Sequence, residues 1–370
     1  MNIMDLIKRN LDFVITAILT AVVLFCAPFD IEYYYSCVNL PLLIKLFCLM
    51  AVVAGLREYG LLDRFWKSLL PKATTPRTIG RFFVFICFFS SMFITNDVAL
   101  IIFVPLAIEV LLRCGLYREL IWVVSLETVA ANMGSMLTPL GNPQNLFLYE
   151  HFHLNLLDFL AITFPVTLLC GIIIYFFTLV FDEHEVIMPE IKFNHLSRRV
   201  LLLLSFLFVM CILCVLRVIS ASTLILVVVF FLSFLKGRVL LKVDFKLLGL
   251  FVLLFLLVGG LGRFEIMHTW PRSIIESDVF LTTVATCQLI SNVPAAVMLS
   301  GFTADYRNLL LGVSIGGLGT LIASMASLIS FKAYMQLTRQ SVTRYLWIFT
   351  LVNVLMLIVL CAFKYLLDLL

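Results

Sequence analysis

The sequence predicts an all-α polytopic membrane protein with about nine transmembrane helices and two re-entrant hairpins, arranged as two repeats of inverted topology. Three observations predict this fold. Of the 370 residues, 63% are hydrophobic and 13% are charged, whereas about 25% are charged in soluble domains. Many apolar runs have roughly the 20 residues that a membrane crossing needs. Basic residues and short polar motifs divide these runs in a regular pattern. Soluble and disordered chains are thereby excluded.

Seven apolar runs are expected to cross the membrane as plain helices. Lys8 and Arg9 precede the first of them, as in a signal peptide, but no clear cleavage site of small residues follows. We therefore interpret that run as a membrane helix. Most of the ten cysteines lie inside such runs, where they act as small hydrophobic residues. The seven runs are 11–28, 40–56, 159–181, 200–216, 219–235, 247–262 and 345–366.

The positive-inside rule predicts how run 82–112 enters the membrane, because Lys and Arg mark cytoplasmic segments. Six basic residues lie in segment 57–81, and Arg113 and Arg118 follow the run. A full crossing would separate these two groups of charges. A re-entrant hairpin that enters and leaves by the cytoplasmic face keeps both inside. The same rule makes run 279–302 a hairpin that enters from the exterior.

The complete topology map places twenty basic residues inside and four outside, with a cytoplasmic amino terminus and an external carboxy terminus. It also contains a symmetry. The order crossing, crossing, hairpin, crossing, crossing describes both residues 1–181 and residues 219–370, and the connecting loop and linker helix at 182–218 invert the second copy. Inverted repeats with broken helices are typical of secondary transporters, whose binding sites lie near the middle of the membrane.

Matching polar motifs lie at the two hairpin tips and in the long crossings that follow them, 119–150 and 308–331. The tips read ITND (94–97) and ISNVP (290–294), and the crossings contain NMGSMLTPLGNPQN (132–145) and GGLGTLIASMAS (316–327). In this comparison, Gly134-Ser135 aligns with Gly319-Thr320. Because the same two motifs occur in both halves, we expect the helix interruptions in the two halves to serve the same function.

The stretch Pro139–Asn145 cannot continue a helix, because it contains two prolines, a glycine and two asparagines. An unpaired backbone group costs several kcal/mol in hydrocarbon, so irregular backbone is expected only where it lines a cavity. Carbonyl, hydroxyl and amide oxygens suit a bound Na⁺. Free N–H groups at the starts of half-helices suit an anion. The motifs therefore predict binding of an anion, a cation or both.

Two acidic residues are expected within the membrane, where a carboxylate is a functional candidate by default. Asp97 could bind the driving cation or carry a proton; alternatively, Asp97 or Asn96 caps the returning half-helix. Glu127 is the second coupling candidate, with a structural pair to a basic or polar neighbour as the alternative. Glu109 is expected to pair with Arg113 at helical spacing.

At these motifs the chain resembles the ArsB/NhaD ion-transporter superfamily, a clan that includes divalent-anion:sodium symporters and citrate permeases. The likeness spans most of the chain and is closest to the YbiR type of bacterial inner-membrane anion transporters. It rests on Thr95–Leu100 with Pro105, on 134–145, and on the second-half segments Ser291-Asn292 and 316–320. The resemblance implies location in the inner membrane and an elevator mechanism, in which hairpins and broken helices carry substrate past a scaffold.

The resemblance also implies the residues of the binding site. The implied tip residues are Thr95, Asn96, Asp97, Ser291 and Asn292, and the residues lining the unwound segments are Gly134, Thr138, Gly141, Asn142, Asn145, Gly319 and Thr320. A Na⁺ ion would be held by Asn96, Asn142 and Asn145. The second half has ASMAS (323–327) where the clan often has another proline–asparagine loop, so we expect one cation site, in the first half.

We expect a secondary active transporter for a small anion, a carboxylate or an inorganic oxyanion, coupled to Na⁺ or H⁺. No Arg or Lys falls at the motif positions, which leaves open an arsenite-type efflux permease or a Na⁺/H⁺ antiporter. An intramembrane enzyme and a passive channel are the remoter alternatives. We expect a lipid bilayer as surroundings, no nucleic-acid partner, no cofactor or metal besides the coupling ion, and a chain that could form a homodimer.

Overall fold

The computed structural model describes residues 11–27, 30–59, 74–186, 198–235, 237–264, 275, 277–338 and 341–369. These residues form sixteen α-helices and one short 3-10 helix, and no strand occurs among them. The prediction of an all-α chain is therefore confirmed. Five of these helices are long and apolar enough to cross a membrane: α4 (Leu40–Glu58), α6 (Pro76–Ile94), α10 (Leu156–Thr178), α11 (Arg198–Val215) and α19 (Val342–Leu369).

The other helices are shorter or more polar. Four further apolar ones are α2 (Leu11–Cys26), α12 (Ala221–Phe234), α13 (Phe245–Leu261) and α15 (Val279–Ile290). The rest are α3 (Ile31–Cys37), α7 (Asn96–Arg113), α8 (Tyr117–Ser135), α9 (Pro143–His151), η2 (Gly237–Lys242), α16 (Asn292–Ser300), α17 (Tyr306–Ile315) and α18 (Met325–Leu337). The number of crossings, their orientation and the inverted repeats stay predictions. The basic residues Lys8, Arg9, Arg64, Lys67, Lys72, Lys192, Lys236, Arg272 and Arg339, on which the topology map draws, lie outside the described residues.

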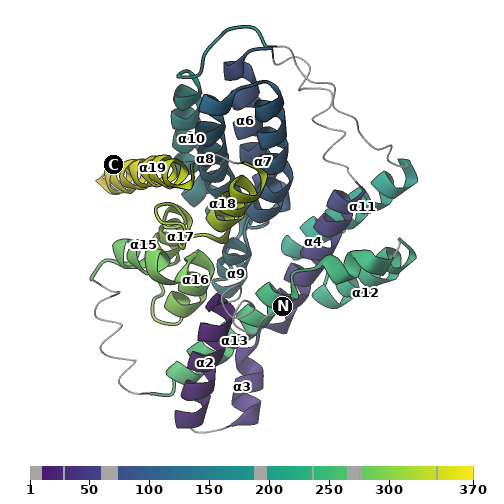
Figure 1. Ribbon diagram of the computed structural model, residues 1–370. Coiled ribbons are helices and arrows are strands. Elements are labelled where there is room, and N and C mark those ends of the chain that lie inside the picture. Colours follow the sequence, from purple (N-terminus) through teal and green to yellow (C-terminus); the bar gives the residue numbers. More distant parts are fainter. Residues whose placement is uncertain are drawn as a thin grey trace.

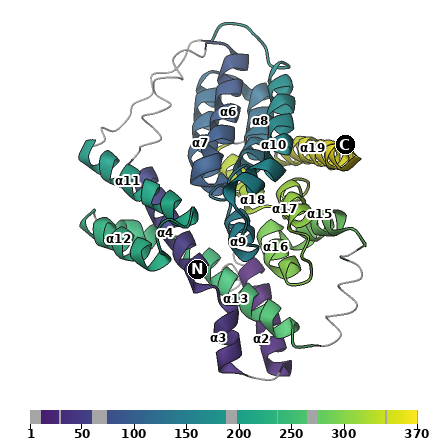
Figure 2. The same cartoon turned by 180° about the vertical axis from the view of Figure 1, so that it is seen from behind.

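The helices fall into two groups, which Figures 1 and 2 show from opposite sides. In the central group, α6, α7, α8 and α10 stand side by side, α18 and α19 pack against them, and α15, α16 and α17 form an adjoining cluster. The peripheral group contains α2, α3, α4, α11, α12 and α13. The two groups meet where α9 touches α4 and where α16 touches α13. Each group therefore combines helices from both halves of the sequence.

A buried ion pair lies at one of these contacts between the groups. The Nζ atom of Lys45, in α4, is 2.7 Å from Oε1 of Glu150, in α9, and the two side chains are only 8% and 14% exposed. Removal of either partner would leave a buried charge without its counterion, which typically costs 3–5 kcal/mol. This pair therefore fixes the position of α9 against the peripheral group in the observed arrangement.

Two pairs of consecutive helices are each joined by a single residue. Thr95 connects α6 to α7, and Ser291 connects α15 to α16; the helices of each pair pack against each other. These pairs correspond to the expected runs 82–112 and 279–302. The first helix begins earlier than expected, at Pro76, because Thr75 forms a reciprocal capping box with Thr78 and a proline suits the first helical position.

The long crossing 119–150 is broken, and so is the crossing 308–331. Residues 136–142 separate α8 from α9, and residues 316–324 separate α17 from α18. The break predicted at Pro139–Asn145 is thus three residues too far along the chain. Pro143 begins α9 instead of interrupting it, because a proline at the first position of a helix loses no hydrogen bond.

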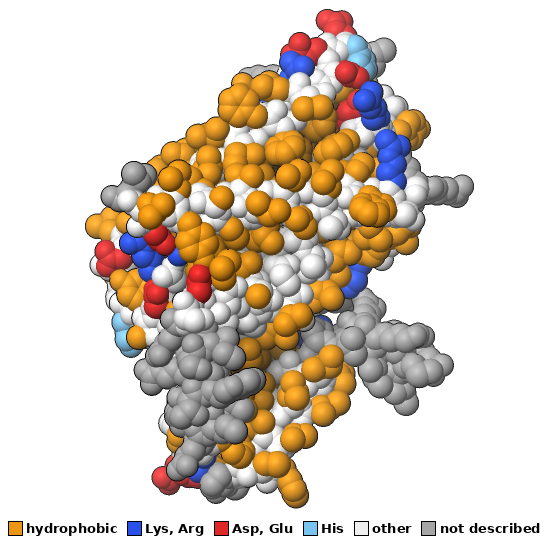
Figure 3. Space-filling view, turned by 90° about the vertical axis from the view of Figure 1, so that its left-hand side faces the viewer, with side chains coloured by type: hydrophobic (Ala, Val, Ile, Leu, Met, Phe, Trp, Pro, Cys, Tyr) orange, Lys and Arg blue, Asp and Glu red, His pale blue; other side chains and the backbone are white. Residues whose placement is uncertain are grey.

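The outer surface suits a lipid environment. In Figure 3, hydrophobic side chains cover most of one face, and charged side chains gather mainly near its ends and edges. The expected surface pair is also present, since Arg113 Nη2 lies 2.6 Å from Glu109 Oε1. Large exposed side chains of α10 and α19 contribute to the apolar surface: Phe164, Leu168, Ile172, Phe176, Trp347, Leu351 and Ile358.

Close packing of α8 on α6 depends on Gly134. A Cβ atom at this position would lie 2.1 Å from the carbonyl oxygen of Phe88 and 2.7 Å from Oγ of Ser91. The nearest obstacle is backbone, which cannot move aside like the end of a side chain. Gly134 was predicted to line the unwound segment; it lies instead in the last turn of α8, where it allows the two helices to approach.

Replacement of Gly134 by alanine is therefore expected to destabilise the protein by about 1–3 kcal/mol through overpacking. The measurement is the Tm of the purified protein in detergent. Gly171→Ala is the matched control, because its Cβ would meet only the ring of Phe88, at 3.3 Å. Equal Tm values for the two variants would contradict this explanation.

Candidate binding site at the paired helix breaks

The tip of each helix pair is hydrogen-bonded to the non-helical segment that interrupts the next broken helix. The amide N–H of Asn96 donates to the carbonyl of Gly141 at 3.1 Å, and the amide N–H of Asn292 donates to the carbonyl of Ala323 at 3.0 Å. The first N–H groups of a helix have no partner within that helix. The two bonds therefore satisfy the first N–H group of α7 and of α16 and hold both tips against non-helical backbone.

The two tip residues have strained backbones. Thr95 has φ 72° and ψ 147°, and Ser291 has φ 75° and ψ 158°. Only glycine adopts this region readily, and other residues held there typically cost about 1–3 kcal/mol. Neither residue forms a side-chain capping bond to the helix that it precedes. The hydroxyl-bearing residues that were predicted at the tips, Thr95 and Ser291, therefore occupy both turns although their backbone conformation lowers the stability of the protein.

Asn132 connects the first tip with the second break. Its Oδ1 atom accepts from Nδ2 of Asn96 at 3.0 Å and from the hydroxyl of Ser324 at 3.1 Å. Its own Nδ2 donates to the carbonyl of Gly317 at 3.4 Å. The structure thus brings parts of both sequence halves together at one buried amide. Sequence reasoning quoted Asn132 within the motif but did not select it; its place two residues before Gly134 is the only local signal.

The first break contains two amide oxygens without a donor. Asn145 donates through Nδ2 to the carbonyls of Ser135, at 3.0 Å, and Thr138, at 3.3 Å. Asn142 donates through Nδ2 to the hydroxyl of Ser135, which itself donates to the carbonyl of Asn132 at 2.8 Å. These partners fix which end of each amide is the nitrogen. The Oδ1 atoms of Asn142 and Asn145 are therefore buried oxygens with no hydrogen-bond partner among the residues that the structure describes.

A buried acceptor with no donor needs an explanation, because nearly all such groups are satisfied in native proteins. Amide oxygens are good ligands for hard cations, so Asn142 and Asn145 fit the predicted Na⁺ site. Asn96 fits it less well, since its Oδ1 already accepts from the Asp97 amide at 2.8 Å and its Nδ2 is bound to Asn132. Of the three predicted ligands, two offer an unpaired oxygen.

The remaining first-half residues surround this break. Thr138 donates its hydroxyl to the carbonyl of Met92, at the end of α6. Gly141 supplies the carbonyl that holds the tip. Asp97 lies half-buried in the first turn of α7, where a carboxylate is favoured by the helix dipole. No ion pair within the described part of the chain includes it. Glu127 is fully buried in α8.

Gln288, which sequence reasoning missed, organises the second break. Its Nε2 donates to the carbonyls of Gly316, at 2.9 Å, and Leu318, at 3.0 Å, and its Oε1 accepts from the amide of Thr320 at 2.9 Å. Gly319 has φ 99°, and a Cβ there would lie 2.5 Å from this Oε1. The amide oxygen of the second half is therefore already paired, unlike those of Asn142 and Asn145.

The two breaks also differ in where the aligned residues lie. Gly134 and Ser135 end α8, whereas Gly319 and Thr320 lie within the non-helical segment between α17 and α18. The sequence alignment thus paired positions that differ in structure. The bonds from Asn96 and Asn292 instead place Gly141 and Ala323 in corresponding positions.

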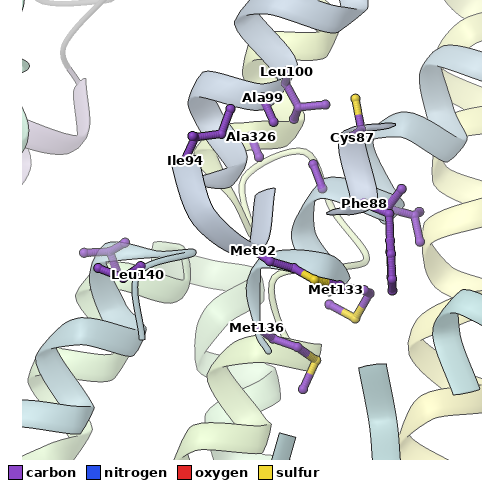
Figure 4. Close-up of a cluster of buried hydrophobic side chains, with 14 of the residues drawn as sticks. Cys87, Phe88, Met92, Ile94, Ala99, Leu100, Met133, Met136, Leu140 and Ala326 are labelled. Atoms are coloured by element: carbon purple, nitrogen blue, oxygen red, sulfur yellow. The ribbon is translucent and has the colours of Figure 1, made fainter. Parts of the chain in front are cut away.

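Apolar side chains enclose the first tip and break, as Figure 4 shows. Met92 of α6, Met133 of α8 and Met136 beyond it are all buried in the same cluster. Ala326 of α18 and Ala99 of α7 belong to this cluster where those two helices pack. Methionine adapts its shape to its neighbours, so this shell can exclude water from the polar groups and still allow rearrangement.

A family model described as "Citrate transporter" matches residues 3–307 of the chain. The chain belongs to the citrate transporter family. The expected resemblance to the ArsB/NhaD clan and to the YbiR type is thereby confirmed. Members of the family are transporters and not enzymes, and the apolar helices agree with a multi-pass membrane protein.

Three curated relatives support this assignment. The chain is 35% identical over 324 residues to the uncharacterized transporter MJ0456 of Methanocaldococcus jannaschii, which covers 86% of this chain and 87% of the relative. It is 29% identical over 322 residues to the inner membrane protein YbiR of Escherichia coli, covering 83% of each. It is 27% identical over 134 residues to the silicon efflux transporter LSI3 of rice, Oryza sativa subsp. japonica, covering 36% of this chain and 27% of the relative.

The strained tips give a testable consequence. Ser291→Gly is expected to raise the Tm, because glycine relieves a backbone cost of about 1–3 kcal/mol and loses only about 0.5–1 kcal/mol through its greater freedom in the unfolded chain. Ser291→Ala is the control, since it removes the hydroxyl and keeps the strain. A glycine variant that melts no higher than the alanine variant would show that this backbone conformation costs little.

Proposed function

We propose that the protein is a secondary active transporter that moves a small anion, a carboxylate or an inorganic oxyanion, across the cytoplasmic membrane together with Na⁺ or H⁺. The observation that carries this proposal is the junction at Asn132, where two helix breaks meet around buried amides. Irregular backbone of this kind persists in a membrane protein only where it is buried in the protein or lines a water-filled cavity. Membership of the citrate transporter family supports the same conclusion.

Half-helix starts at this junction suit an anion. The helices α7, α9 and α16 begin there without a side-chain capping bond, whereas α18 is capped by the hydroxyl of Ser324. Uncapped first-turn N–H groups and the positive ends of helix dipoles attract negative charge. The amide oxygens of Asn142 and Asn145 would hold a cation nearby, which in turn favours a bound anion. No arginine or lysine is then needed at the site.

An elevator movement is consistent with the division into two helix groups. The central group carries both breaks, and the peripheral group touches it mainly through α4 and α13. In the proposed mechanism the central group moves relative to the peripheral group and exposes the junction to each side of the membrane in turn. The binding residues then remain together throughout the movement.

The silicon efflux relative favours a second candidate, efflux of a neutral oxyacid such as silicic acid or arsenite. The site offers hydroxyl and amide groups without a cationic side chain, which also suits an uncharged polyhydroxy molecule. Transport assays in proteoliposomes should therefore include labelled citrate, silicic acid and arsenite, each with and without gradients of Na⁺ and H⁺. Accumulation of none of the three against a concentration gradient would contradict both candidates.

Removal of the junction amides is expected to reduce transport strongly. Hydrogen bonds to charged groups contribute about 1.5–3 kcal/mol, so Asn96→Ala, Asn292→Ala and Asn142→Ala should each reduce uptake about tenfold or more. Asn155→Ala, at the exposed start of α10, is the control. Membrane yield and Tm report on insertion and folding. Uptake at the wild-type rate in the first two variants would place the binding site elsewhere.

Asp97 is the proposed coupling residue for the cation. Asp97→Asn removes the negative charge and keeps the shape, so uptake should lose its dependence on the driving cation, while binding of substrate is retained. The measurement is the initial uptake rate as a function of Na⁺ concentration and of pH, with Asp158→Asn as the surface control. If the variant keeps the full cation dependence of the wild type, Asp97 has no coupling role.

A further inference from the structure

Glu127 is a carboxyl group enclosed by the protein with almost no polar contact. It lies in α8 and has 0% exposure. Within the described part of the chain, it accepts one hydrogen bond, from the thiol of Cys87 in α6, with Sγ 3.6 Å from Oε1. Its other oxygen, Oε2, is buried and has no partner among these residues. None of the ion pairs in the described segments includes this residue.

The groups around Glu127 offer protons but no positive charge. Among the described residues, the titratable group that contacts it is the thiol of Cys87 from α6, and α19, which packs against α8, carries the buried phenol of Tyr345. Tyr334 of α18 stacks on Tyr345, with ring centroids 4.3 Å apart. No hydrogen bond or ion pair of the described residues joins Glu127 to a titratable group of α7, α10 or α17. The hydroxyl of Tyr345 is itself buried without a partner.

A carboxylate in this setting would be ionised at a high energetic cost. Burial of a charge that has no counterion costs several kcal/mol even after the protein relaxes, and a weak thiol donor offsets little of it. The neutral acid avoids this cost, so the observed arrangement favours Glu127 with a bound proton. A purely structural acid would be expected to use both oxygens, as buried polar groups normally do.

We propose that Glu127 is a proton-binding site of the transporter, occupied in the observed conformation. The site consists of the Glu127 carboxyl and the Cys87 thiol that donates to it, and it is separate from the amide oxygens of Asn142 and Asn145. A proton from water adds to the carboxylate when the conformation admits water, and it leaves to water when the site opens again. This inference rests on the proposed function and deepens it by naming H⁺ as an ion that the protein carries.

The position of Glu127 links it to the binding junction. It precedes Asn132 by five residues on the same helix, which corresponds to about 7.5 Å along the axis at 1.5 Å per residue. The residue after Glu127 also binds α18, because Thr128 Oγ1 donates to Ser330 Oγ at 2.7 Å. Ser324, which caps the start of α18, is a direct partner of Asn132. A change of charge at Glu127 would therefore act on both helices that meet at the junction.

The test is infrared difference spectroscopy of the full-length protein in lipid vesicles, with H⁺ and D⁺ as the only probes. At neutral pH we expect a carbonyl stretch from a protonated carboxylic acid that is absent in Glu127→Gln and shifted in Cys87→Ala. The band should move on transfer to D₂O and should disappear reversibly as the pH is raised. Glu109→Gln, which alters a surface ion pair, should leave it unchanged.

The Cys87→Ala variant keeps the test decisive if Glu127→Gln does not fold, because it retains the carboxyl and changes only its donor. Absence of a protonated-acid band that responds to these substitutions would overturn the proposal, since Glu127 would then be ionised. A band that neither exchanges with D₂O nor titrates would also overturn it, since the acid would be structural. Neither result depends on substrate, so failure here is distinguishable from failure of the transport assays.

Discussion

The structure depends on one constraint: backbone groups released by a helix break inside a membrane must find partners within the protein. The chain meets it in both halves by the same device, a tip amide that donates to a break carbonyl. Side-chain amides complete the pairing. Asn145 and Gln288 each donate to two carbonyls of a break, and Asn132 joins the two sets of groups. The junction is thus a packed polar core within an apolar protein.

The two halves share this backbone bond but differ in how the side-chain amides around it are paired. Around the first break, the amide nitrogens of Asn142 and Asn145 are used and their oxygens are not. Around the second break, both ends of the Gln288 amide are used. In the second half, which lacks the proline–asparagine loop, the Gln288 side chain pairs with the backbone groups of the break. The structure therefore gives a physical reason to expect an asymmetric transporter, with cation ligands concentrated on one side of the junction.

Much of this arrangement could be predicted from the sequence, because its causes are local. Tips at Thr95 and Ser291 and breaks after α8 and α17 follow from short polar motifs in apolar runs, whereas the backbone strain at the tips does not. The exact start of α9 could not be predicted from composition, since Pro143 is equally able to end one helix and to begin another. Gln288 and Asn132 were missed for a different reason. Their partners are distant in the chain, up to 192 residues away for Asn132, and no local pattern records such contacts.

The ion pair between Lys45 and Glu150 has a kinetic consequence. Sliding of α9 past α4 by even one helical turn, about 5.4 Å, would separate two charges that are shielded from water. The barrier to such sliding would include the cost of exposing or re-pairing both groups, and several kcal/mol of barrier corresponds to a slowing by orders of magnitude. In the proposed elevator movement, a single ion pair outside the binding residues would thus limit the turnover number.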